Sequence, residues 1–104
     1  MKSVTVVELK AMMDSGEDFQ LIDVREPNEY EVCNLGGVLI PLATVPLHSE
    51  KFEKDKKVIV HCRSGKRSAN AVNYMEQQGY DNLYNLEGGI LAWSDEIDPS
   101  MPKY

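Results

Sequence analysis

Short apolar runs alternate with amphipathic segments along the chain. Strand-length apolar runs lie at residues 19–24, 38–40, 57–62 and 82–86. The run at 57–62 is rich in β-branched residues and shows no clean alternation, as in a strand that is covered on both faces. Because helical patterns separate these runs, the sequence predicts an α/β domain with a mainly parallel sheet.

The helical segments carry their own start and stop signals. Thr5 and Glu8 have the spacing of a capping box, and Gly16 is a suitable C-terminal stop for the helix between them. Residues 68–78 place apolar side chains on one helical face, which makes them the clearest predicted helix. Residues 90–97 predict a last helix.

Length and charge narrow the functional classes. The 104 residues are 42% hydrophobic and carry a net charge of -6, so we expect one domain over residues 1–104. The acidic balance argues against nucleic-acid binding and against docking on anionic membranes. The longest apolar stretch is broken by glycines and prolines and is too short to span a bilayer. The N-terminal segment has no apolar signal core, so a cytoplasmic location is expected.

The candidate chemistry lies in the loop after the strand at 57–62. Cys62 ends this strand, and the C-terminal ends of parallel strands face the crevice where such sheets bind ligands. The loop consists of Arg63, Ser64, Gly65, Lys66, Arg67 and Ser68. A glycine that allows N–H groups to turn inward, three cations and a helix N-terminus all favour a thiolate at Cys62. An inert core thiol would explain the apolar strand but not the cations beside it.

Three blocks of sequence resemble the single-domain rhodanese family of sulfurtransferases. They are residues 21–30 (LIDVREPNEY), 58–68 (VIVHCRSGKRS) and 85–93 (NLEGGILAW), which occur in family order and span most of the chain. The resemblance implies a rhodanese-like fold with a five-stranded, mainly parallel sheet flanked by helices on both faces. Residues 33–38 and the C-terminal segment are similar to rhodanese-like domains fused to ubiquitin-activating-like adenylyltransferases, which pass sulfur toward carrier proteins.

The resemblance implies that Cys62 becomes a persulfide held by loop amides. The expected donor is a small anion of the thiosulfate type, and the expected acceptor is cyanide, a thiol or a sulfur-carrier protein. The loop cations and the N–H groups of residues 63–68 would bind the donor and stabilise the persulfide. We expect Asp23 and Arg25 to support the loop, Asp23 by pairing with a loop cation; an ordinary strand-end charge cluster is the alternative.

The spacing of Cys62 and Arg67 and the presence of the cysteine distinguish this hypothesis from two alternatives. Cysteine-dependent phosphatases and arsenate reductases separate their cysteine and arginine by five residues, whereas four separate Cys62 from Arg67. A non-catalytic regulatory module of the same fold usually lacks the cysteine. No metal or organic cofactor is expected, because the two cysteines and two histidines lack ligand spacing. Cys33 is interpreted as a packing residue, and His61 as a packing or hydrogen-bonding residue rather than a general base.

Overall fold

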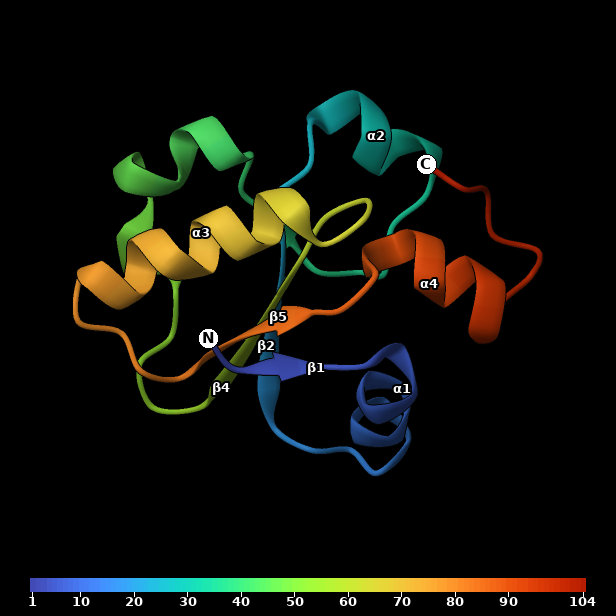
Figure 1. Ribbon diagram of the computed structural model, residues 1–104, viewed down its shortest axis with the longest axis horizontal. Helices are drawn as coiled ribbons and strands as arrows, with labels where there is room; N and C mark the ends of the chain where they lie inside the picture. The colour runs from blue at the N-terminus through green and yellow to red at the C-terminus, as the bar shows by residue number, and fades with distance from the viewer.

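Strands and helices alternate along residues 1–104, all of which the computed structural model describes (Figure 1). The strands are β1 (Ser3–Val4), β2 (Phe19–Asp23), β3 (Val38–Leu39), β4 (Lys57–His61) and β5 (Leu83–Leu86). The helices are α1 (Val6–Asp14), α2 (Pro27–Val32), α3 (Lys66–Gln77) and α4 (Gly89–Glu96). Two short 3-10 helices, at Leu42–Leu47 and Ser49–Lys51, connect β3 to β4.

The five strands form one sheet in the order β1-β5-β4-β2-β3. Every neighbouring pair is parallel, and β4 lies at the centre between β5 and β2. The register of β2 against β4 places Asp23 beside His61 at the carboxyl end of the sheet. The predicted α/β class with a five-stranded parallel sheet is therefore confirmed.

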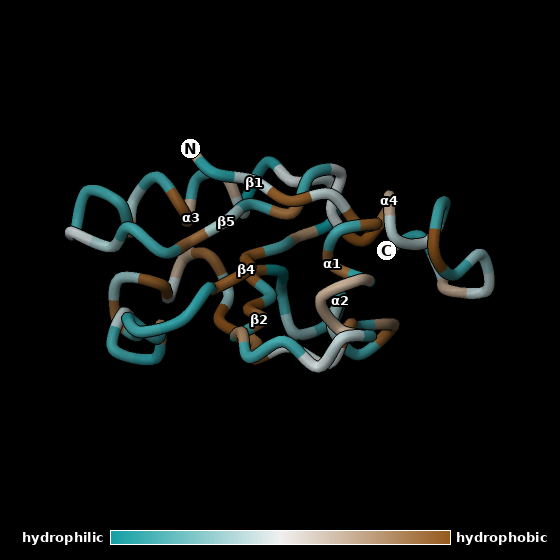
Figure 2. The backbone as a smooth tube through the Cα atoms, turned by 90° about the horizontal axis from the view of Figure 1, so that it is seen from below, coloured by the Kyte–Doolittle hydropathy of each residue, from teal (hydrophilic) through white to brown (hydrophobic).

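Helices cover both faces of the sheet. Successive strand residues point to opposite faces, so Val60 and Ile59 of β4 belong to different apolar clusters. Val60 packs in the cluster that includes Met75 of α3. Ile59 packs in the cluster that includes Leu9 of α1 and Trp93 of α4. Figure 2 shows this division, with α3 on one side of the strands and α1 and α4 on the other.

The predicted capping box at the start of α1 is present. The Glu8 amide donates to Thr5 Oγ1 over 3.1 Å, and the Thr5 amide donates to Glu8 Oε1 over 2.9 Å. Gly16 follows the end of α1 with a φ of 71°, a left-handed conformation that costs glycine little. The local sequence signals therefore set both ends of this helix.

Two elements differ from the sequence prediction. Strand β1 was not predicted, because two residues carry no periodicity; it forms by pairing with Asn85 and Leu86 of β5. Helix α3 begins at Lys66, two residues earlier than predicted, since its N-cap is Gly65 and no capping side chain marks the start. Arg67 and Ser68 consequently lie in the first turn of α3 rather than in a free loop.

Candidate active site

Cys62 lies directly after β4, where the chain turns into α3. Gly65 has a φ of 104° and sits at the N-cap of α3, so the turn between strand and helix is tight. This left-handed conformation strongly favours glycine. In Figure 1 the turn is the yellow loop between the start of α3 and the start of α4, below α2. Cys62 therefore lies at the carboxyl end of the central strand, as the sequence predicted.

Hydrogen-bond donors converge on the Cys62 sulfur. The Gly65 amide lies 3.1 Å from Sγ, and the Ser68 amide and hydroxyl each lie 3.4 Å from it. Burial raises the pKa of the Cys62 thiol, but the hydrogen bonds from Ser68, Gly65 and Ser64 outweigh burial, so the net shift is downward. The sulfur is therefore surrounded by groups that stabilise negative charge on it.

The start of α4 holds the outer side of this loop. The amides of Ile90 and Leu91 donate to the carbonyls of Cys62 and Arg63 over 3.0 and 3.1 Å. Gly89 has a φ of 57°, and a Cβ built there would lie 2.6 Å from the Cys62 oxygen and 2.5 Å from that of Arg63. Glycine is therefore required at this position both by its backbone conformation and by the close approach of two carbonyls. With the carbonyls bound on the outside, the loop amides are left to face the sulfur.

The three loop cations have different surroundings. Arg67 forms a two-point ion pair with Glu29 of α2, with Nη1–Oε1 and Nη2–Oε2 distances of 2.7 and 2.9 Å. Arg63 and Lys66 are exposed, and Arg63 Nη2 donates to the carbonyl of Lys103 over 3.4 Å. Hydrogen bonds from Ser68 and the loop amides are the largest of the effects that lower the pKa of Cys62, and Arg67 and the Cys62 thiolate also attract each other. The predicted direction of the pKa shift and the predicted contribution of the loop N–H groups are supported, whereas the cations contribute less than expected.

The expected pairing of Asp23 with a loop cation is wrong. Asp23 is instead bound by Arg25, whose Nη2 lies 2.8 Å from Oδ2, and both side chains are fully buried. Arg25 also donates to the carbonyls of Glu29 and Cys33, over 3.4 and 2.7 Å, at the carboxyl end of α2. The Cys33 carbonyl lies beyond the last turn of α2, and the Arg25 guanidinium supplies its donor. Asp23 and Arg25 therefore support α2, and α2 in turn presents Glu29 to Arg67.

His61 is buried on the other face of the sheet from Cys62. Its Nε2 lies 3.7 Å from Asp23 Oδ2, and neither ring nitrogen makes a hydrogen bond. Burial lowers the pKa of His61, so the ring is neutral at pH 7. Because adjacent strand residues point to opposite faces, His61 is not aimed at the sulfur. The structure supports its interpretation as a packing residue.

Cys33 is partly buried at the end of α2. Its Sγ donates to the carbonyl of Pro102 over 3.5 Å, so it contacts the C-terminal segment rather than the loop around Cys62. No group of three or more His, Cys, Asp and Glu side chains is placed to hold a metal ion. The candidate chemistry is therefore centred on one cysteine.

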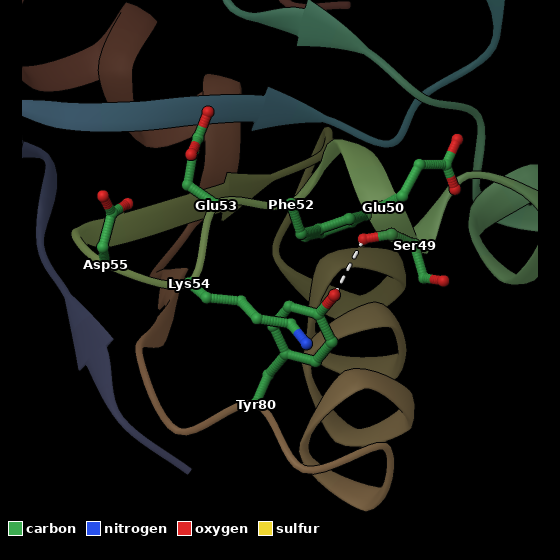
Figure 3. A pocket seen from close by; sticks show the side chains of 7 residues that line it. All are labelled: Ser49, Glu50, Phe52, Glu53, Lys54, Asp55 and Tyr80. Carbon is green, nitrogen blue, oxygen red and sulfur yellow. Dashed lines mark hydrogen bonds between the residues drawn. The ribbon is translucent and has the colours of Figure 1, made fainter.

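An open depression of about 500 Å³ lies away from this site. It is lined by Ser49, Glu50, Phe52, Glu53, Lys54, Asp55 and Tyr80 (Figure 3). Tyr80 donates to the Ser49 carbonyl over 3.0 Å, and Lys54 Nζ lies 5.0 Å from the centre of the Tyr80 ring. Most of its wall precedes β4, whereas Cys62 follows β4, so the two features lie at opposite ends of this strand, roughly 15 Å apart along it.

Sequence reasoning missed three positions that build this site. Glu29, Asn85 and Gly89 all lie inside the blocks that resemble rhodaneses, but none was predicted to contact the cysteine loop. Their contacts join segments far apart in the sequence, so no local pattern reveals them. The glycine pair Gly88-Gly89 directly before a predicted helix was the one sequence clue to a tight approach at Gly89.

Comparisons with known proteins agree with this geometry. The family model described as "Rhodanese-like domain" matches residues 5–96. A crystal structure of a rhodanese-like domain protein from Staphylococcus aureus superposes with a TM-score of 0.84 and 38% identity, covering 93% of this chain and 95% of that one. The chain belongs to the family of rhodanese-like domains.

Curated relatives include proteins named as sulfurtransferases. A protein named "Sulfurtransferase" from Allochromatium vinosum is 40% identical over 79 residues, which are 75% of this chain and 74% of that protein. "Rhodanese-like/PpiC domain-containing protein 12, chloroplastic" from Arabidopsis thaliana is 39% identical over 99% of this chain, which spans 37% of that protein. "Adenylyltransferase and sulfurtransferase MOCS3-2" from Zea mays is 29% identical over 97% of this chain, which spans 23% of that protein. These relatives support a sulfurtransferase-type role.

Proposed function

We propose that this domain transfers sulfane sulfur from a small anionic donor to a thiophilic acceptor through a persulfide on Cys62. The observation that carries the proposal is the position of Cys62 Sγ at the end of β4, within 3.4 Å of two backbone amides and one hydroxyl. Such donors stabilise a thiolate before the reaction and an anionic persulfide after it.

The chemistry proceeds in two half-reactions. With a donor of the thiosulfate type, the Cys62 thiolate attacks the outer sulfur, a new sulfur–sulfur bond forms and sulfite leaves with the electron pair of the broken bond. The acceptor, which is cyanide in an assay or a thiol or sulfur-carrier protein in the cell, then attacks the outer sulfur and releases the Cys62 thiolate. Because both halves share one covalent intermediate, ping-pong kinetics are expected.

The remaining loop residues have proposed roles in donor binding. Arg63 and Lys66 are exposed beside the loop and are placed to attract an anion. The backbone of Ser64, Gly65 and Ser68 would bind the persulfide. Arg67, which is paired with Glu29, would hold the loop in position rather than bind the donor.

The setting of the domain is also part of the proposal. The chain offers no helix with both the length and the apolar character needed to cross a membrane. Both cysteines are free, and a reducing compartment such as the cytoplasm, the location we expect, would keep the Cys62 thiol reduced. We expect residues 1–104 to act as a single domain without a cofactor. The name of the maize relative, which joins adenylyltransferase to sulfurtransferase, favours a sulfur-carrier acceptor.

A phosphatase or arsenate reductase is the weaker hypothesis. Those reactions need an arginine directed at a bound oxyanion, and Arg67 is committed to Glu29 by two hydrogen bonds. A non-catalytic module is also disfavoured, since it has no need of a cysteine inside a cradle of donors.

Intact-mass measurement after incubation with thiosulfate tests the proposal. Wild type and Cys33→Ser should both gain the mass of one sulfur atom, and reductant or cyanide should remove it. Cys62→Ser should gain nothing, although its far-ultraviolet circular dichroism should match that of wild type. A sulfur adduct on Cys62→Ser, or none on wild type with any of several anionic donors, would contradict the assignment.

A further inference from the structure

Asn85 of β5 contacts two residues of the cysteine loop, Gly65 and Ser68. Its Nδ2 donates to the Gly65 carbonyl over 3.2 Å, and its Oδ1 accepts from the Ser68 hydroxyl over 2.5 Å. Both partners contact Cys62 Sγ themselves, through the Gly65 amide and the Ser68 hydroxyl. Asn85 therefore does not contact the sulfur itself but binds two groups that do. It has no role in the chemistry proposed above.

The orientation of the Asn85 amide follows from its partners. A backbone carbonyl can only accept, so the nitrogen of Asn85 must face Gly65 and its oxygen must face Ser68. The Ser68 hydroxyl is then the donor in the bond to Asn85.

Two acceptors consequently compete for the single proton of the Ser68 hydroxyl. Asn85 Oδ1 lies 2.5 Å from Ser68 Oγ, whereas Cys62 Sγ lies 3.4 Å from it. Ser68 is fully buried, so water offers no easy alternative. While the proton points at Asn85, a lone pair of Oγ faces the sulfur. That arrangement suits a thiol, which can donate, and does not suit a thiolate, which can only accept.

We propose that Asn85 is a positioning residue that sets the direction of the hydrogen bond between Ser68 and Cys62. In the thiol form the bonds run in one direction, from Sγ–H to Ser68 Oγ and from Oγ–H to Asn85 Oδ1. When the thiol proton leaves to solvent, the Ser68 hydroxyl turns about its Cβ–Oγ bond and donates to the sulfur, giving up its bond to Asn85. Asn85 thus stabilises the neutral thiol relative to the anion and restrains ionisation between turnovers.

The proposal predicts the direction in which the pKa of Cys62 changes in variants at Asn85. Asn85→Ala removes the acceptor at Asn85 Oδ1 and leaves Cys62 Sγ as the other acceptor in contact with the Ser68 hydroxyl, so the pKa of Cys62 should fall further. Asn85→Asp keeps an acceptor for that proton and adds negative charge near the sulfur, so the pKa of Cys62 should rise. A residue that merely braced the loop would give the opposite result in Asn85→Ala, because a loosened loop would lose amide donors.

The test is the pH dependence of Cys62 alkylation by iodoacetamide, followed by peptide mass spectrometry, in a double-mutant cycle. Asn85→Ala should lower the pH of half-maximal rate in the Ser68 background and leave it unchanged in the Ser68→Ala background. A rise in Asn85→Ala, or an equal shift in both backgrounds, would overturn the proposal. If Asn85→Ala does not fold, Asn85→Asp is compared in the same two backgrounds. Its charge acts in both, so a larger upward shift with Ser68 than with Ser68→Ala supports the proposal, and an equal shift overturns it.

The effect of Asn85 on the pKa of Cys62 does not depend on the proposed function. Only its relevance to sulfur transfer rests on that function. Alkylation needs no sulfur donor, so the cycle gives its answer even if Cys62 never forms a persulfide. Conversely, a persulfide that forms normally while the cycle shows no coupling would reject Asn85 and keep the proposed function.

Discussion

Glu29 and Arg67 meet through two hydrogen bonds of 2.7 and 2.9 Å that join α2 to the first turn of α3. The carboxylate is mostly buried, with 11% of its side chain exposed, and the guanidinium is 32% exposed. A forked pair of this kind fixes orientation as well as distance. Arg67 is therefore held from outside the cysteine loop, and its guanidinium is not free to bind a substrate anion with the same two nitrogens.

The Glu29–Arg67 pair should make stability depend on acid pH. The hydrogen bond from Arg67 outweighs burial and lowers the pKa of Glu29 from 4.5 to about 2. Above pH 4.5 the stabilisation of the folded state by this pair is fully present. It is lost as the pH falls toward 2, because Glu29 takes up its proton at a higher pH in the unfolded chain than in the folded protein. We expect the free energy of unfolding to fall by about 2–3 kcal/mol between pH 4.5 and pH 2.

Urea unfolding of Glu29→Gln between pH 2 and 7 checks this expectation. The variant should be less stable at pH 7 by about 1–3 kcal/mol and should show a flatter pH profile. Asp14→Asn, which breaks the exposed Lys10–Asp14 pair on α1, is the matched control and should change stability by less than about 0.5 kcal/mol. Parallel pH profiles for wild type and Glu29→Gln would show that the pair does not carry the effect.

A second prediction concerns the origin of the acidity of Cys62. Hydrogen bonds from Ser68 and from loop amides, which outweigh the effect of burial, lower the pKa of this thiol. Ser68→Ala should therefore raise the pH of half-maximal alkylation clearly, whereas Lys66→Met should shift it less. The midpoint is the quantity to compare, since Cys62 is only 1% exposed and its absolute rate includes reagent access. A larger shift in Lys66→Met than in Ser68→Ala would restore the cations as the main cause.

Much of this site could be predicted from local sequence, and the rest could not. Cys62 was identifiable because an apolar strand, a glycine and a helix start follow one another within a few residues. The partner of Arg67 could not be found in this way, since Glu29 is 38 residues away and reaches it only after α2 is positioned. Strand β1 was missed for the same reason, because its two residues become a strand only by pairing with β5.

The contact between α4 and the loop gives a third prediction. Gly89 and Gly16 have similar positive φ values of 57° and 71°, but only Gly89 has backbone atoms less than 3 Å from the position that a Cβ would occupy. Gly16→Ala should cost about 1–2 kcal/mol for its backbone conformation alone. Gly89→Ala should cost about 1–3 kcal/mol more, because the carbonyls of Cys62 and Arg63 must move.

Chemical denaturation of the two variants, together with the alkylation midpoint of Cys62, measures both effects. Gly89→Ala should also shift the midpoint, since the displaced carbonyls carry the loop amides with them, and Gly16→Ala should not. Equal losses of stability and an unchanged midpoint would mean that the loop tolerates the added carbon.

A fourth prediction separates sulfur transfer from phosphoryl transfer. One preparation assayed with thiosulfate and cyanide should form thiocyanate, and the same preparation should hydrolyse p-nitrophenyl phosphate negligibly. The physical reason is that Arg67, the arginine in the first turn of α3, is bound to Glu29 and is not free to grip the phosphoryl oxygens. Phosphatase activity that dominates, and that disappears in Cys62→Ser, would place the domain in the rival class.

The hydrogen bonds from α4 to the loop carbonyls determine how much of the chain must be moved if this site is to be grafted onto another protein. A segment containing residues 62–68 alone would carry the cysteine and its amides, but not the groups from Asn85 to Leu91 that bind the opposite side of the loop. In another scaffold those carbonyls would seek other donors, and the peptide planes would rotate away from the sulfur. A transplanted site therefore needs at least the continuous stretch from β4 through α4, two strand–helix units that together surround one sulfur atom, and Arg67 would still lack its partner Glu29 of α2.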